Sequence, residues 1–245
     1  MRAREFSPNA VAKDEAIMMA VVERLRALGR TVDVVNEREP WTLSFDCDLI
    51  ITMGRLPETI RRLQNISVNV INRPEGVAHC CRKSLQQLMR AYDIPMPPEK
   101  GDCGYWLKRG DVAGSMSDDD VVFVADADEL KARVDVFRQR GVDDYTVSAH
   151  VKGEEMKFYG VLHTGFFRSY SLTDQQATLV PGLCEVAERL AAVVGVEVYG
   201  GDCIVRQDGT FCIIDFNDWP SFSGCREEAA SAIVSAIAMQ LLNDK

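Results

Sequence analysis

Residues Tyr199–Ser223 read YGGDCIVRQDGTFCIIDFNDWPSFS, and they predict two β-strands joined by a tight turn. Apolar runs stand on both sides of Asp208-Gly209, the dipeptide most typical of a two-residue hairpin turn. A two-residue turn at this position predicts that Val205 faces Cys212. It also sets the register of every pair further from the turn.

The same register brings three oxygen-bearing side chains together. Asp202 is predicted to face Asp215, and Asn217 points the same way as Asp215 because side chains alternate along a strand. Carboxylates that face each other lie about 5 Å apart at Cβ and destabilise a sheet, although acid pairs at sheet ends are often simply solvated. Oxygen ligands of this kind suit Mg²⁺ or Mn²⁺, which bind through one or two carboxylates plus substrate phosphates. We therefore predict a divalent metal site at these three residues.

The composition limits the classes of protein. A chain of 245 residues with 47% hydrophobic content can bury a substantial core, in one large domain or in two to three small ones. The formal net charge of −9 argues against nucleic acid as a partner, since a basic surface is missing. No apolar run approaches a membrane span, and the first residues lack the apolar core of a secretion signal. Eight cysteines without metal-binding spacing indicate a reduced, cytoplasmic protein, whose oligomeric state the sequence leaves open, a homodimer included.

The first part of the chain predicts alternating helices and strands. The predicted elements are a helix over 12–28, strands at 31–35, 49–53 and 68–71, and a helix that begins at Pro57 and runs to about Leu63. Strands separated by helices imply a parallel sheet, whose ligands gather beyond the carboxyl ends of the strands. Arg55 and Arg73 stand at such ends, while no glycine-rich dinucleotide motif follows any of these strands.

A Pro-rich segment after a helix over 82–92 predicts a linker to the remainder. The elements predicted beyond it are strands at 105–108, 121–124, 145–151 and 156–163, and helices over 128–140, 182–194 and 226–242, with a segment over 165–171 that is given no element type. The polar loop over 109–120 contains two glycines and ends in three aspartates. We interpret it as a mobile flap, with an ordinary exposed hairpin loop as the alternative.

The order of these elements, with acids and lysines at particular strand positions, resembles the ATP-grasp superfamily over nearly the whole chain. The strongest match is GGDCIV…FCIIDFND, where family members place an Asp, then Glu or Asp, then Asn two residues on. The likeness is greatest to the ribosomal-protein glutamate ligase and D-alanine–D-alanine ligase branches. It implies an α/β and α+β fold with a small parallel-sheet domain over 1–80, a lid subdomain over 81–151, and a C-terminal subdomain with the metal site over 152–245.

The resemblance also implies which residues contact ATP and carry the chemistry. The implied ATP-binding residues are Lys83, Lys108, Ser148, Ala149, His150, Val151, Glu155 and Lys157. Lys108 ends an apolar strand beside the flexible loop, where an ammonium acts as a point charge on phosphate. Arg168 resembles the basic residue that meets the terminal phosphate, and Arg168 and Lys157 are the catalytic candidates. For His150 the alternative is a hydrogen-bonded strand residue without a role in binding.

The implied reaction joins a carboxylate to an amine (or thiol) through an acylphosphate, with ATP and Mg²⁺ or Mn²⁺. Small-molecule carboxylate and amine substrates would lie near Ser221, with Arg55 and Arg73 either clamping a carboxylate or pairing with nearby acids. Ligases of D-alanine carry an arginine where Gly200 stands, so this chain requires another donor or different chemistry. A small-molecule kinase on the same fold and a nucleotide-binding module without turnover are the alternatives.

Overall fold

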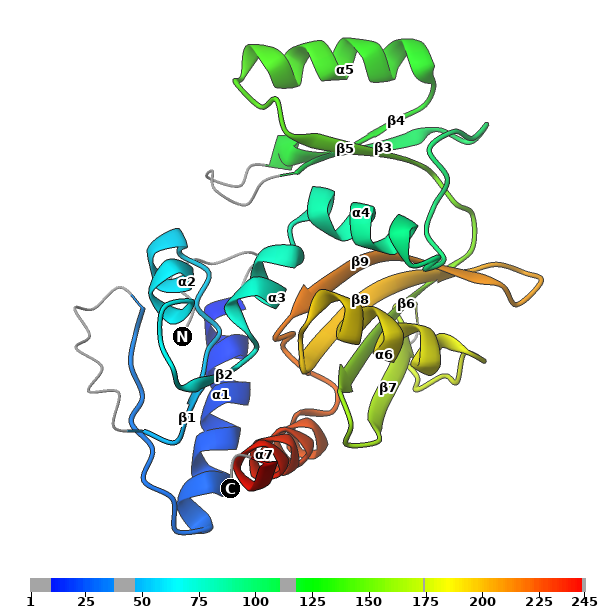
Figure 1. Ribbon diagram of the computed structural model, residues 1–245. Helices are drawn as coiled ribbons and strands as arrows, with labels where there is room; N and C mark the ends of the chain where they lie inside the picture. The colour runs from blue at the N-terminus through cyan, green and yellow to red at the C-terminus, as the bar shows by residue number, and fades with distance from the viewer. Residues whose placement is uncertain (1–9, 38–46, 111–117, 174, 244–245) are drawn as a thin grey trace.

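The computed structural model describes residues 10–37, 47–110, 118–173 and 175–243 (Figure 1). The strands are β1 (Leu49–Ile51), β2 (Asn69–Ile71), β3 (Tyr105–Arg109), β4 (Val121–Val124), β5 (Tyr145–Ala149), β6 (Glu154–Val161), β7 (Phe166–Ser171), β8 (Val198–Val205) and β9 (Phe211–Asp218). The helices are α1 (Ala10–Ala27), α2 (Pro57–Leu63), α3 (Pro74–His79), α4 (Arg82–Ala91), α5 (Ala127–Gln139), α6 (Leu183–Val194) and α7 (Arg226–Asn243), with a 3₁₀ turn at Asp118–Asp120. Within the described ranges, no helix combines the length and apolar character that a bilayer crossing requires.

The strands of the described residues form three sheets, one in each third of the chain. β1 and β2 pair in parallel, as the alternation of helices and strands predicts. The second sheet has the order β4-β3-β5 and the third the order β7-β6-β8-β9, and both are antiparallel. The mixed α/β and α+β architecture predicted from the sequence is therefore confirmed.

The strand predicted at residues 31–35 is wrong. This segment is extended but belongs to no sheet of the described residues, and Val34 and Val35 are 41% and 37% exposed. Valine favours strands mainly because it packs well on a half-buried pleated surface, and here that surface is missing. The predicted flap lies mostly outside the described residues, since the structure describes residues 109, 110 and 118–120 of it.

The β4-β3-β5 sheet is covered on one face by α5 (Figure 1). Leu107 of β3 is fully buried there against Phe137 and Val142. The helix begins at a capped end, where the Asp126 carboxylate accepts hydrogen bonds from two backbone N–H groups. Because side chains alternate along a strand, Trp106 and Lys108 project from the opposite face, away from α5.

The four-stranded sheet has a different apolar layer on each face. One face buries Phe158, Tyr199 and Phe216 in a core with α4 and α6. The other face, which includes Tyr159 and Val198, meets α1 and α7 at one end. Beyond the contact with α1 and α7, the same face of the sheet carries polar side chains, and these form the candidate site.

The hairpin between β8 and β9 differs from the sequence prediction at the turn and agrees with it at the facing acids. The turn is one residue longer than predicted: Arg206 N–H donates to the Thr210 carbonyl at 2.8 Å, and Gly209 adopts a left-handed φ of 82°. Val205 consequently faces Phe211 rather than Cys212. A bulge between Asp202 and Cys203 then restores the register, because the partners skip from residue 213 to residue 215.

The N-terminal third docks on the four-stranded sheet through specific contacts. The buried Asn72 amide accepts hydrogen bonds from the N–H groups of Glu197 and Val198, both at 2.8 Å, and donates to the Val198 carbonyl at 2.7 Å. Gly76 of α3 approaches Gly195 so closely that a Cβ at residue 76 would lie 2.1 Å from the Gly195 carbonyl oxygen. This position therefore requires glycine for steric reasons.

We expect Gly76→Ala to lower the free energy of unfolding by about 1–3 kcal/mol, because α3 must move away from Gly195. Urea denaturation followed by circular dichroism measures this change. Gly224→Ala is the matched control, since its Cβ would lie 3.5 Å from Tyr170, which is ordinary contact. We expect the control to remain within about 0.5 kcal/mol of wild type. Equal stability of Gly76→Ala and wild type would contradict the close packing of α3.

Candidate functional site

Three oxygen-bearing side chains gather on β8 and β9. Asp202 and Asp215 are direct partners in the ladder, so they face each other as the sequence predicts. Asn217 points the same way, and its Nδ2 donates to Asp215 Oδ2 at 3.2 Å. The Asp215 Oδ1 atom accepts from the Phe216 N–H at 3.1 Å, which fixes the orientation of the carboxylate. The structure thus brings the three predicted metal ligands together.

Two lysines from different sheets approach these acids. Lys157 of β6 lies opposite Asp202 in the register, and its Nζ donates to Asp202 Oδ1 at 2.5 Å. Lys108 reaches toward the acids from β3, where Asp215 and Asp202 interact with it electrostatically. Burial lowers the pKa of Lys108, and the carboxylates oppose that change. The β4-β3-β5 sheet and the four-stranded sheet therefore contribute cations to one polar centre.

The electrostatics of this centre favour a bound cation. Burial raises the pKa of Asp202, Lys157 lowers it, and the charges of Asp215 and Glu155 raise it further. A divalent ion would offset this repulsion. The described residues contain no cluster of three or more His, Cys, Asp or Glu side chains arranged for a metal. Two carboxylates and one amide still fit Mg²⁺, which takes its remaining ligands from water and phosphate.

Arg82 is a basic residue of this region that the sequence analysis missed. It begins α4, its Nη1 donates to the Arg109 carbonyl at 2.8 Å, and its charge lowers the pKa of Lys108. Helical spacing could have found it, because Arg82 lies three and seven residues before the buried Leu85 and Met89. The buried face of α4 therefore carries Arg82 toward Lys108.

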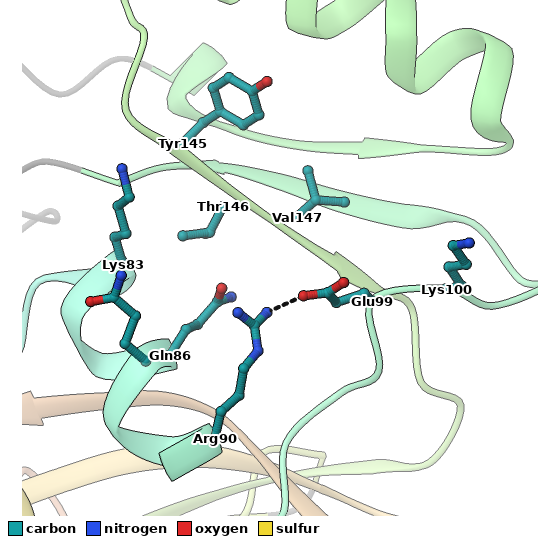
Figure 2. Close-up of a pocket in the computed structure, with 9 residues that line it drawn as sticks. Lys83, Gln86, Arg90, Glu99, Lys100, Tyr145, Thr146 and Val147 are labelled. Carbon is teal, nitrogen blue, oxygen red and sulfur yellow. Dashed lines mark ion pairs between the residues drawn. The ribbon is translucent and has the colours of Figure 1, made fainter.

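Lys83, the predicted ATP-binding residue, lies on a different face of α4 (Figure 2). Its Nζ forms an ion pair with Asp144 at 3.2 Å, and its side chain is 59% exposed. It lines a groove of about 420 Å³ between α4 and the edge strand β5, and Arg90 is paired with Glu99 in the same groove. Asp202, Asp215 and Asn217 do not line this groove. Lys108 does not line this groove either, so the structure does not bring Lys83 and Lys108 together in it.

The predicted adenine-binding segment follows β3 in register. Ser148 faces Trp106, while the N–H groups of Ala149 and His150 donate to the carbonyls of Pro98 and Gly104, both at 2.8 Å. The His150 ring lies beside Trp106, whose Nε1 donates to its Nδ1 at 3.2 Å. Val151 lies two residues after the end of β5, and Glu155 is exposed on β6. Backbone and ring contacts therefore hold this segment, while Glu155 is open to solvent on the side of the acids.

The predicted catalytic and substrate arginines are all paired with acids. Arg168 donates to Glu228 of α7, and its guanidinium lies 5.3 Å from the centre of the Phe166 ring. Arg55 donates to the buried Asp218, which directly follows the candidate ligand Asn217. Arg73 is 70% exposed and lies 3.9 Å from Glu197. The structure thus places Arg55 against Asp218 at the end of β9 and leaves Arg73 on the surface.

The position of Gly200 has no room for a side chain. A Cβ there would lie 2.7 Å from Pro220 Cγ and 2.8 Å from the Phe158 carbonyl oxygen. Tyr159 lies opposite Gly200 in the ladder, and its hydroxyl hydrogen-bonds with Ser221. Burial raises the pKa of Tyr159 to about 12, so the hydroxyl stays protonated near neutral pH. Two hydroxyl groups, those of Tyr159 and Ser221, therefore lie beside Gly200.

Comparison with solved structures places this architecture in a known class, although no protein-family model and no curated protein matches the sequence. An ATP-grasp RimK domain protein from Sphaerobacter thermophilus DSM 20745 superimposes with a TM-score of 0.66 at 18% identity, over 89% of this chain and 94% of that one. D-alanine–D-alanine ligase from Bacillus anthracis gives a TM-score of 0.67 at 12% identity, over 100% and 98%. The ATP-grasp ligase PsnB, in complex with a precursor variant, Mg and ADP, gives 0.64 at 16%, over 96% and 95%.

The chain therefore has the ATP-grasp fold, as its sequence motifs predict. These similarities extend over almost the full length of each compared chain. At such low sequence identity the agreement concerns the fold, so the chemistry has to be argued from the residues of this chain.

Proposed function

We propose that this protein is an ATP-dependent ligase that joins a carboxylate to an amine, or to a thiol, through an acylphosphate intermediate. The observation that carries the proposal is the meeting of Asp202, Asp215 and Asn217 with Lys157 and Lys108 between two sheets. The structural neighbours support it, because they include a D-alanine–D-alanine ligase and an ATP-grasp ligase complexed with Mg and ADP.

ATP would lie between the lid sheet and the four-stranded sheet, with its phosphates toward the acids. Asp202, Asp215 and Asn217 would hold Mg²⁺, which when bound neutralises phosphate charge and orients the phosphates. Lys108 and Arg82 lie on the lid side of the same centre and would offset the charge of the transferred phosphoryl group. Lys157 would keep Asp202 ionised, because an adjacent ammonium favours the carboxylate form.

The proposed reaction has two steps. A carboxylate oxygen of the substrate attacks the γ-phosphorus of ATP, the bond to the β-phosphate bridging oxygen breaks, and ADP leaves. The amine nitrogen then attacks the carbonyl carbon, phosphate departs, and the amine loses a proton. The hydroxyl groups of Tyr159 and Ser221 would donate hydrogen bonds beside Gly200, where the substrate carbonyl would lie. Such positioning and charge compensation account for most of the catalysis in phosphoryl transfer.

The proposal is tested with pooled substrates. The protein is incubated with Mg-ATP and a pool of carboxylates, with either pooled amines or hydroxylamine as the nucleophile. Hydroxylamine captures an acylphosphate as a hydroxamate even when the natural amine is unknown. We expect phosphate release that depends on the carboxylate pool, with a new amide or hydroxamate detected by mass spectrometry. An Asp215→Asn preparation purified in parallel controls for contaminating ATPase.

Two other results would reject the ligase. Transfer of phosphate to a polyol without hydroxamate would identify a small-molecule kinase on the same fold. Tight ATP binding without release of phosphate in any pool would identify a nucleotide-binding module without turnover. Each result corresponds to one of the alternatives that the sequence leaves open.

A further inference from the structure

A buried ion pair joins the N-terminal third of the chain to the end of β9. Arg55 stands in the loop between β1 and α2, and its Nη2 donates both to the Asp218 carboxylate and to the Asp218 carbonyl oxygen, the latter at 3.3 Å. The Asp218 side chain is fully buried and that of Arg55 is 17% exposed. Burying two charges costs several kcal/mol per ion, so a pair of this kind is weak evidence for a role in stability.

Both partners are held in place by further contacts. The backbone N–H groups of Arg55 and Leu56 donate to Glu37 Oε2, both at 3.1 Å, and this fixes the loop that presents the guanidinium. The Cys80 thiol, between α3 and α4, also lies against the backbone of Asp218, and its burial raises its pKa. Two segments of the N-terminal half therefore meet at Asp218 of the C-terminal sheet, and a third segment, at Glu37, holds the loop of Arg55.

That residue directly follows the candidate metal ligand Asn217. Side chains alternate along β9, so Asp218 faces the N-terminal segments while Asn217 faces Asp215. Asn217 pairs in the ladder with Gly200, which has no side chain to pack against it. The chain then leaves the sheet at Trp219, where φ is +42°. The orientation of Asn217 thus depends on how the end of β9 is held.

We propose that Arg55 is a positioning residue that orients Asn217 toward Asp202 and Asp215 by holding Asp218. The inference rests on the proposed function, because it assumes that these three residues bind a divalent cation with nucleotide. It makes the N-terminal third a supporting part of the metal site. It also assigns Arg55 a role other than clamping a substrate carboxylate. If Arg55 only clamped a substrate, altering it would leave metal affinity unchanged.

Mn²⁺ is the probe for this proposal. Free Mn²⁺ is titrated by electron paramagnetic resonance into the full chain in the presence of AMP-PNP, for wild type and for Arg55→Lys. Lysine keeps the positive charge but lacks the planar guanidinium, whose Nη2 donates to the Asp218 carboxylate and to the Asp218 carbonyl oxygen. We expect Mn²⁺ affinity to fall by about 10- to 100-fold, the usual cost of losing a partner that orients a metal ligand. The affinity for AMP-PNP in EDTA should stay within about twofold of wild type, because Arg55 holds a metal ligand rather than the nucleotide.

Arg24→Lys is the matched control. Arg24 also joins the N-terminal third to the C-terminal part, through an ion pair with Glu227 at 2.6 Å, but it lies on α1 and its hydrogen bonds go to residues of α1 and α7. We expect wild-type Mn²⁺ affinity for this variant. If Arg55→Lys does not fold, Asp218→Asn is measured in the same way, because it keeps the shape of the side chain and weakens its bond to Arg55. The same loss of Mn²⁺ affinity is then expected.

A folded Arg55→Lys or Asp218→Asn variant that binds Mn²⁺ like wild type would overturn the positioning role and leave the proposed function intact. A wild-type protein that fails to bind Mn²⁺ with AMP-PNP would overturn the proposed function and, with it, this inference. The two failures are therefore distinguishable in one set of titrations.

Discussion

Asp215→Asn is expected to abolish turnover and to leave the fold intact. The amide keeps the shape of the carboxylate and can still accept from the Phe216 N–H. It removes one of two negative charges that the proposed Mg²⁺ site requires. A metal ion contributes several kcal/mol of charge stabilisation in the transition state, so we expect a loss of about a thousandfold or more in kcat. Carboxylate-dependent phosphate release measures the rate, and urea denaturation measures the stability.

Asp208→Asn provides the control for this variant. The residue belongs to the same hairpin and receives the same chemical change, but it lies exposed at the turn, where its Oδ1 accepts from Thr210. Asparagine can also accept this hydrogen bond, so we expect wild-type turnover. Stability should not fall in Asp215→Asn, because the change relieves repulsion between facing carboxylates. A wild-type rate for Asp215→Asn would eliminate the proposed metal site.

Lys108→Met is expected to lower kcat by about 10²- to 10³-fold, the range for removing one preorganised group that stabilises developing charge. Methionine has a similar length and no charge. Since burial lowers the pKa of Lys108, the fold opposes the charged form of this side chain. Removing the charge should therefore not unfold the β4-β3-β5 sheet. Steady-state kinetics with Mg-ATP and the active carboxylate pool measures kcat and the KM for ATP.

Lys131→Met is the control for Lys108→Met. Lys131 is exposed on α5, which covers the face of the lid sheet opposite to Lys108. The same loss of charge at this position should leave kcat within about twofold of wild type, since exposed charges are screened by solvent. Equal kinetics for Lys108→Met and Lys131→Met would show that Lys108 does not act on the phosphates.

The sequence predicted the facing acids correctly, although one step of the reasoning was wrong. A two-residue turn was expected, and the actual turn is longer by one residue. The bulge at Asp202 and Cys203 cancels the difference before the acids are reached. The turn rule describes local backbone preference, whereas the bulge depends on how the two strands pack in the whole sheet. The prediction for Val205 therefore failed while that for Asp202 and Asp215 held.

Other features could not be derived from local patterns. Arg55 and Asp218 are 163 residues apart, and no periodicity connects them. Two basic residues, Arg82 and Lys83, stand at the start of α4. The family resemblance favours Lys83, while helical spacing favours Arg82. Arg73 and Arg55 follow neighbouring strands and looked equivalent, but only a structure can separate an exposed guanidinium from one at an interface.

The tight packing around Gly200 restricts how this protein can be redesigned. Introducing the arginine of the D-alanine ligases at this position would drive its Cβ into Pro220 and into the main chain of β6. A protein engineer would therefore have to reshape the loop after β9 before adding the guanidinium. The obstacle from β6 would remain even then, since it is backbone rather than side chain. An arginine at this position thus requires coordinated changes in the loop after β9 and in β6, and no single substitution can achieve it.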